Sequence, residues 1–237
     1  ISLNKGQSLA LNLNATNLSA GPLSKASIKL QGSGTLTNHT LSLALADHDQ
    51  QLDLNLTGGL GSSAKSAKTT ANPMTWQGHV QRIALNHPQL GPWQTTKQSA
   101  LSISGNNVKL GNLCLIQEQG DSPASLCSAF AMQDKTLALK GYIHALSLDR
   151  LSTGLPPGSS IQGNVDSEFN VEGSLDQLSG EFSLQAAPIV IRYQAGADED
   201  ALEHQASLSA SAKLKNGQVN SEMQFAIADV GSMTGSL

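Results

Sequence analysis

The sequence predicts an all-β protein built from a mainly antiparallel sheet. Apolar and polar residues alternate with a period of two, which is the period of a strand. Turn-forming residues separate the runs at short intervals, and connections this short leave no room for the crossover helix that a parallel pair requires. Aromatic residues make up only 3% of the 237 residues, and the alternating apolar positions are mostly leucine. One face of the predicted sheet is therefore aliphatic and the other polar.

The alternation recurs along the whole sequence, beginning with Leu9, Leu11 and Leu13. Alternate residues of a strand point to one face, so the apolar positions are the candidate lining of an apolar surface. The opposite parity carries short polar residues such as Asn12 and Asn55, typical of a face in contact with water. The candidate lining residues are Leu9, Leu11, Leu13, Leu41, Leu43, Leu45, Leu52, Leu54, Leu56, Leu101, Ile103, Val108, Leu110, Leu137, Leu139, Phe169, Val171, Phe182, Leu184, Ile189, Ile191, Phe225 and Ile227.

Turn formers mark the ends of the predicted strands. Asn216 and Gly217 indicate a two-residue hairpin, because both residues tolerate the positive φ that a type I′ turn requires. A short helix or 3₁₀ turn is expected at residues 148–155, before a Pro-Pro-Gly break. Further turns are expected at residues 32–34, 47–50, 58–59, 106–107 and 134–135.

Two longer polar segments read as surface loops. Residues 194–204 contain the acidic run Asp198-Glu199-Asp200, and residues 58–73 are rich in Gly, Ser, Ala, Lys and Thr. The second segment exceeds the usual length of a connection, so we place a boundary there. The expected organisation is a first group of strands at 1–57, a flexible loop at 58–75 and a second group at 76–237 that continues the first.

The composition and the missing motifs exclude several classes of function. Charged residues make up 14% and the net charge is −4, which argues against nucleic-acid binding. The sequence contains no nucleophile elbow, phosphate-binding loop, H-E-x-x-H, EF-hand or dinucleotide fingerprint, so we expect neither an enzyme nor a cofactor. The six histidines are scattered singly, and we expect surface histidines and no metal site. No apolar run is long enough to span a membrane as a helix, and the sequence begins like an excised piece of a longer chain.

The two cysteines, Cys114 and Cys127, lie 13 positions apart with a polar, turn-rich loop between them. This spacing favours a disulfide that closes a hairpin, while two free structural thiols and a metal or redox role remain open alternatives. A disulfide would imply an oxidising compartment such as the periplasm.

A set of motifs between residues 76 and 188 resembles the TamB (translocation and assembly module) family and its AsmA-like relatives of diderm bacteria. The motifs are W-Q-G at 76–78, L-G-P-W at 90–93, the Cys114 and Cys127 pair, L-S-L at 146–148, L-P-P-G at 155–158, I-Q-G at 161–163 and V-E-G-S-L at 171–175. The rest of the sequence is similar to the family only in its composition and alternation.

The resemblance implies the central periplasmic portion of a protein anchored in the inner membrane. Such a protein forms an elongated, curved, U-shaped sheet with an apolar concave groove. It acts as a bridge that carries phospholipid between the inner and outer membranes and supports outer-membrane assembly. Its barrel partner, a TamA-like outer-membrane protein, would be engaged by parts of the protein outside this chain.

Two other interpretations of the apolar positions stay open at this point. The leucines could fill the closed core of a sandwich or barrel and touch only one another, as alternating apolar faces often do. The chain could also belong to a structural or adhesive β-solenoid with a dry core, although its strand spacing is irregular for a repeat protein. An uncovered apolar face, in contrast, predicts self-association of the isolated fragment.

Overall fold

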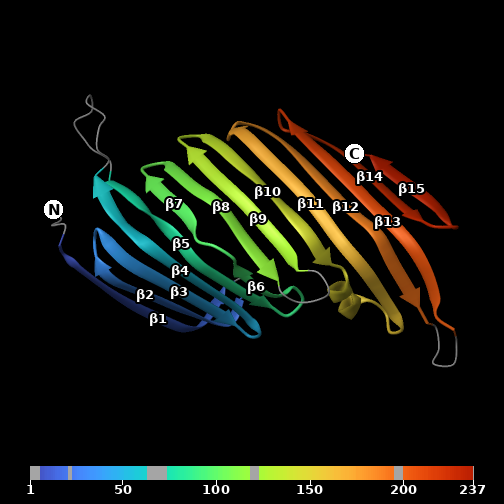
Figure 1. Ribbon diagram of the computed structural model, residues 1–237, viewed down its shortest axis with the longest axis horizontal. Helices are drawn as coiled ribbons and strands as arrows, with labels where there is room; N and C mark the ends of the chain where they lie inside the picture. The colour runs from blue at the N-terminus through green and yellow to red at the C-terminus, as the bar shows by residue number, and fades with distance from the viewer. Residues whose placement is uncertain (1–5, 21–22, 63–73, 118–122, 195–199, 237) are drawn as a thin grey trace. The chain divides into compact units, whose positions relative to one another are not determined.

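The structure is a computed structural model of the chain, and it describes residues 6–20, 23–62, 74–117, 123–194 and 200–236. These ranges contain fifteen β-strands and the 3₁₀ turn η1 (Asp149–Gly154). The strands form one sheet whose order follows the chain from β1 to β15, with β1 and β15 at its two edges (Figure 1). The all-β, mainly antiparallel fold predicted from the sequence is confirmed. The runs of alternating apolar and polar residues lie in strands, in which alternate side chains point to opposite faces.

The sheet divides into two compact units. Unit 1 comprises residues 1–117 and 129–134, unit 2 comprises residues 118–128 and 135–237, and β9 (Ala124–Gln133) has residues in both. The other strands of unit 1 are β1 (Ser8–Ala20), β2 (Leu23–Thr35), β3 (Asn38–Asp47), β4 (Gln50–Ser62), β5 (Met74–His87), β6 (Gly91–Thr95), β7 (Ser99–Ser104) and β8 (Asn107–Gln117). Those of unit 2 are β10 (Thr136–Ser147), β11 (Ser159–Ser174), β12 (Gln177–Tyr193), β13 (Leu202–Lys215), β14 (Gln218–Ile227) and β15 (Gly231–Ser236).

The strand order has one irregularity, at β6 and β7. Both short strands pair with β5 and with β8, β6 along residues 84–87 of β5 and β7 along residues 75–80. The two therefore occupy the place of a single long strand that is interrupted at residues 96–98. Thr95, at the end of β6, accepts a hydrogen bond from the Ile83 backbone N–H through its hydroxyl oxygen, at 3.1 Å.

Several predicted turns are confirmed. Asn216 and Gly217 have φ of 53° and 74°, which are the two positive values that a type I′ hairpin needs. Turns also lie at residues 48–49 and 134–135, within the predicted segments, whereas the turn between β7 and β8 lies at 105–106, one position earlier than predicted. The predicted 3₁₀ turn is η1, within residues 148–155.

The turns predicted at residues 32–34 and 58–59 are wrong, because these glycines lie inside β2 and β4. A Cβ at Gly32 would lie 2.8 Å from Leu41 Cδ2 and 3.3 Å from Leu11 Cβ. Gly32 thus leaves space for the side chains of Leu11 and Leu41, which lie on the two neighbouring strands. A glycine within a strand often marks such a close approach.

The predicted loops are shorter than expected. Residues 58–62 extend β4, and β5 already begins at Met74. Likewise, β12 ends at Tyr193 and β13 begins at Leu202. The remainder of these loops, residues 63–73 and 195–199, which include Asp198 and Glu199, lies outside the described residues. The division into compact units also falls at a different place from the boundary expected at 58–75.

Candidate functional site

The pairing register of unit 1 aligns the predicted lining residues in rows across the strands. Residues that face each other directly in an antiparallel pair lie on the same side of the sheet. One such row crosses β1 to β5 through Leu13, Leu30, Leu43, Leu54 and Ile83, each paired with the next. Because neighbouring strands lie about 4.8 Å apart, the row is a continuous aliphatic stripe.

Further rows lie on the same face of unit 1, two residues away along each strand. A bulge in β5 keeps this arrangement, since Leu54 pairs with Ile83 while Leu56 pairs with Val80. In a regular strand, Val80 and Ile83 would lie on opposite faces because they are three positions apart; the bulge places both on the apolar face. We call this side of unit 1 the apolar face; its predicted members are Leu9, Leu11, Leu13, Leu41, Leu43, Leu45, Leu52, Leu54, Leu56, Leu101, Ile103, Val108 and Leu110.

Unit 2 has an apolar face of its own, built in the same way. Phe169 faces Phe182 directly, and Val171 faces Leu139. A bulge in β12 again preserves the parity, because Ala186 and Ile189 pair with Leu208 and Ala206, which lie on one side of β13. The predicted members on this face are Leu137, Leu139, Phe169, Val171, Phe182, Leu184, Ile189, Ile191, Phe225 and Ile227.

The apolar faces are only partly covered. No leucine whose burial the structure describes is fully buried, and the buried hydrophobic residues are mostly alanines, with Val80, Trp93, Cys127 and Ile189. Leu11 and Leu13 keep 40% and 48% of their surface accessible, and Phe182 keeps 39%. In the core of a closed sandwich such side chains would be almost completely buried. The leucine rows of both units therefore remain accessible apolar surface.

Ile189 is the exception among the predicted lining residues. It is only 3% exposed and forms a small buried cluster with Ala186 and Ala206. Leu148, at the start of η1, packs against this cluster from outside the sheet. At this place the apolar face of unit 2 is a closed core, and Ile189 has almost no surface to offer to a ligand.

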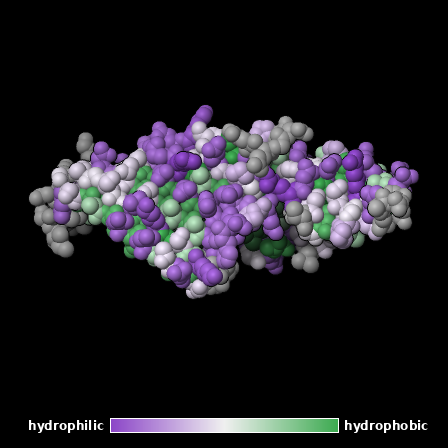
Figure 2. Space-filling view, turned by 90° about the horizontal axis from the view of Figure 1, so that it is seen from below, coloured by the Kyte–Doolittle hydropathy of each residue, from purple (hydrophilic) through white to green (hydrophobic). Residues whose placement is uncertain are grey.

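The opposite face of unit 2 carries two ion pairs. In unit 2, Arg192 Nε lies 2.7 Å from Glu203 Oε2, and Lys213 Nζ lies 3.5 Å from Glu181 Oε1, in each case between directly paired residues of β12 and β13. These exposed ion pairs contribute little to stability. Their position nevertheless shows that β12 and β13 separate charge from aliphatic surface. In the space-filling view, apolar patches alternate with polar surface on the side that is drawn (Figure 2).

Sequence reasoning missed a polar pair on the apolar face of unit 1. His39, expected at the surface, is only 7% exposed, and its Nε2 accepts a hydrogen bond of 2.9 Å from Trp76 Nε1. His39 Nδ1 lies 3.0 Å from the Thr35 carbonyl oxygen. The sequence does contain a signal for this position, because His39 stands two residues before Leu41 and so shares the apolar parity of β3.

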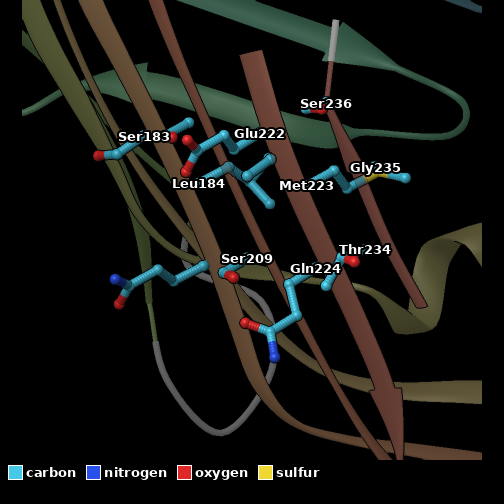
Figure 3. Close-up of a pocket in the computed structure, with 12 residues that line it drawn as sticks. Ser183, Leu184, Ser209, Glu222, Met223, Gln224, Thr234, Gly235 and Ser236 are labelled. Atoms are coloured by element: carbon cyan, nitrogen blue, oxygen red, sulfur yellow. The ribbon is translucent and has the colours of Figure 1, made fainter. Parts of the chain in front are cut away.

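Two hollows among the described residues lie beside polar side chains. One, of about 420 Å³, lies across β12 to β15, where Glu222, Gln224 and Thr234 project from neighbouring strands (Figure 3). The other, of about 660 Å³, lies in unit 1 beside Thr37, Thr57, Gln77 and His79. Neither gathers a catalytic constellation, and the described residues include no cluster of three or more side chains able to hold a metal ion.

Cys114 and Cys127 are disulfide-bonded, which confirms the favoured interpretation of their spacing. Among the described residues, no helix has the length and hydropathy needed to cross a membrane.

Comparison with known proteins identifies the family. The model of a family described as "TamB, N-terminal domain" matches residues 1–237, including the parts of the sequence that the motifs do not cover. The motifs pointed to a central portion of such a protein, whereas the matching model is that of the N-terminal domain. No curated protein and no solved structure matches the chain. The match spans the whole chain, and the chain belongs to the TamB family.

Proposed function

We propose that the chain is a periplasmic segment of a bridge-like lipid transfer protein that is anchored in the inner membrane. Its apolar faces carry phospholipid acyl chains between the inner and outer membranes and so support outer-membrane assembly. The role is non-enzymatic. The observation that carries the proposal is the incomplete burial of the leucines that the register aligns in rows.

The physical argument concerns the cost of moving a lipid through water. Exposing an acyl chain of about 16 carbons costs about 13 kcal/mol at about 0.8 kcal/mol per methylene. A stripe of leucines removes most of this cost along its length. Because the side chains in a row are nearly equivalent, a tail meets no single deep minimum that would trap it. The charged headgroup can meanwhile stay in water.

The disulfide and the family support the proposed location and partners. A disulfide persists in oxidising compartments, of which the bacterial periplasm is one. Membership of the family supports a partnership with a TamA-like outer-membrane barrel, which would be engaged by parts of the protein outside this chain.

The proposal is tested with photocrosslinking residues introduced one at a time at positions 52–57 of the protein in cells. Leu52, Leu54 and Leu56 lie on the apolar face, and Asp53, Asn55 and Thr57 have the opposite parity and are the matched controls. We expect phospholipid adducts at the three leucine positions only. Equal capture at both parities, or no capture at any of the six, would contradict the proposal.

The β-solenoid alternative gains no support from the structure. The strand pairs among β1 to β8 and among β10 to β15 are antiparallel, whereas a β-helix stacks its repeats as parallel strands.

A further inference from the structure

One row on the apolar face of unit 1 differs from its neighbours because it contains three glycines. The row begins at Leu9 on β1 and ends at Leu101 and Leu110 on β7 and β8. The residues paired between these two ends have no aliphatic side chain. The intervening residues, in order of pairing, are Gly34, His39, Gly58 and Gly78.

The indole of Trp76 occupies the space above two of these glycines. A Cβ at Gly58 would lie 2.5 Å from Trp76 Cζ2, and a Cβ at Gly78 would lie 2.6 Å from Trp76 Cη2. The six-membered ring therefore lies against both glycines, and any larger residue would displace it. Trp76 pairs with Leu60 and Ile103 and so lies on the apolar face, and the residue as a whole is half-buried.

His39 fixes the orientation of this indole. Its Nε2 must be the unprotonated nitrogen, because it accepts the hydrogen bond from Trp76 Nε1 at 2.9 Å. Its Nδ1 then carries the proton and donates to the Thr35 carbonyl oxygen at 3.0 Å. The two rings are tilted by 46° with centroids 6.2 Å apart, so the pair is held by this hydrogen bond and not by stacking.

Resting on the acyl-binding role proposed above, we infer that the Trp76 indole is the floor of an acyl-chain subsite in unit 1. His39 is the positioning residue that keeps the six-membered ring of the indole against Gly58 and Gly78. Leu60 and Ile103 pair directly with Trp76 and border the subsite on either side, and Ile103 is 41% exposed.

The chemistry of the subsite favours an acyl chain over a peptide. The indole N–H and both ring nitrogens of His39 already have partners within the protein. A peptide would bring backbone N–H and C=O groups that need hydrogen bonds, and leaving such groups unpaired on an apolar surface is costly. An acyl chain has no such requirement and gains from contact with the indole.

The chain has only two tryptophans, Trp76 and Trp93, which makes the inference testable by fluorescence. In a Trp93→Phe variant, Trp76 is the only indole, and 9,10-dibromostearic acid should quench its emission strongly while stearic acid should not, because bromine quenches at contact. The matched control is Trp76→Phe, in which the remaining Trp93 is only 7% exposed and should be quenched several-fold less.

The role of His39 is tested in the Trp93→Phe background. His39→Leu removes the acceptor, so the indole should lose its fixed orientation, its emission should shift, and dibromostearate binding should weaken about tenfold. His39→Gln keeps an acceptor oxygen and should restore both the emission and the binding. Equal behaviour of the two variants would overturn the positioning role.

A separate measurement distinguishes failure of the subsite from failure of the proposed function. Equilibrium dialysis with radiolabelled stearic acid reports binding anywhere on the unaltered chain. Retention of stearate without quenching of Trp76 would overturn the inference and leave the acyl-binding role standing. No retention of stearate would overturn both.

Discussion

Ser99 shows how single residues differ on the apolar face of unit 1. Ser99 begins β7, pairs with Val80, and is only 2% exposed. Among the described residues, its hydroxyl is the buried side-chain group without a hydrogen-bond partner. A buried hydroxyl that lacks a partner costs about 1–3 kcal/mol.

We therefore predict that Ser99→Ala is neutral or stabilises the chain by up to about 1 kcal/mol, since it removes an unpaired polar group at almost constant volume. Ser104, at the other end of β7, is the matched control because its hydroxyl oxygen accepts a hydrogen bond of 3.0 Å from Thr75 Oγ1. Ser104→Ala should destabilise the chain by about 1 kcal/mol. Urea unfolding of the two variants measures the difference, and a larger loss for Ser99→Ala would contradict the prediction.

For single residues, the sequence predicted which face of a strand a side chain occupies better than it predicted the contacts that the side chain makes there. The period of two correctly placed Leu41, Leu43 and Leu45 on one side of β3. The period of two also places His39 on the apolar side of β3. The role of a histidine on such a face can be recognised only when its hydrogen-bond partner is known. That partner, Trp76, lies 37 positions away, and a single sequence carries no local signal for such a contact.

The strands themselves were easier to predict than the glycines within them. A glycine tolerates many backbone conformations, so residues 32–34 and 58–59 were read as turns. In the structure, Gly32 and Gly58 lie in strands and leave room for Leu41 and for Trp76. Only the side chains on neighbouring strands distinguish these two uses of glycine, and strand pairing is not visible in the local sequence. Asn216 and Gly217 were predicted correctly because the turn itself demands their backbone angles.

The Cys114 and Cys127 disulfide belongs to the element scale, because it links β8 and β9. A crosslink that closes a loop of this length lowers the conformational entropy of the unfolded chain and so contributes about 3 kcal/mol to the free energy of unfolding. We predict a loss of about this size in the Cys114→Ala, Cys127→Ala double variant. Thermal or urea unfolding provides the measurement.

Reduction of the unaltered chain is the control for this prediction. Unfolding with dithiothreitol should shift the unaltered chain toward the double variant and leave the variant itself unchanged. Equal stability of the oxidised chain and the double variant would show that the crosslink contributes nothing.

For the whole molecule, the short connections predicted antiparallel pairing, because they leave no room for the crossover helix that a parallel pair requires. The place of β6 and β7 end to end beside β5 was not predictable, since both have ordinary strand patterns. The sequence also could not decide between an accessible apolar face and a closed core, because both have the same alternation. The exposure of Leu11 and Leu13 favours the first interpretation over a closed core.

An accessible aliphatic face has a consequence for the isolated chain in solution. Apolar patches of this kind promote association, so we predict that the purified chain self-associates as its concentration rises. Leu43, which pairs with Leu30 and Leu54 in the middle of a row, is the position to alter. Leu43→Asp should shift the chain toward monomer, because association would bury its carboxylate without a partner.

Ser42 is the matched control for this variant, since it precedes Leu43 on β3 and has the opposite parity, paired with Gln31 and Asn55. Ser42→Asp adds the same charge to the polar face and should leave self-association nearly unchanged. Sedimentation velocity over a range of concentrations measures both variants beside the unaltered chain. A chain that stays monomeric at every concentration, or an equal effect of the two substitutions, would show that the leucine rows do not drive association and would weaken the case that they are available to lipid.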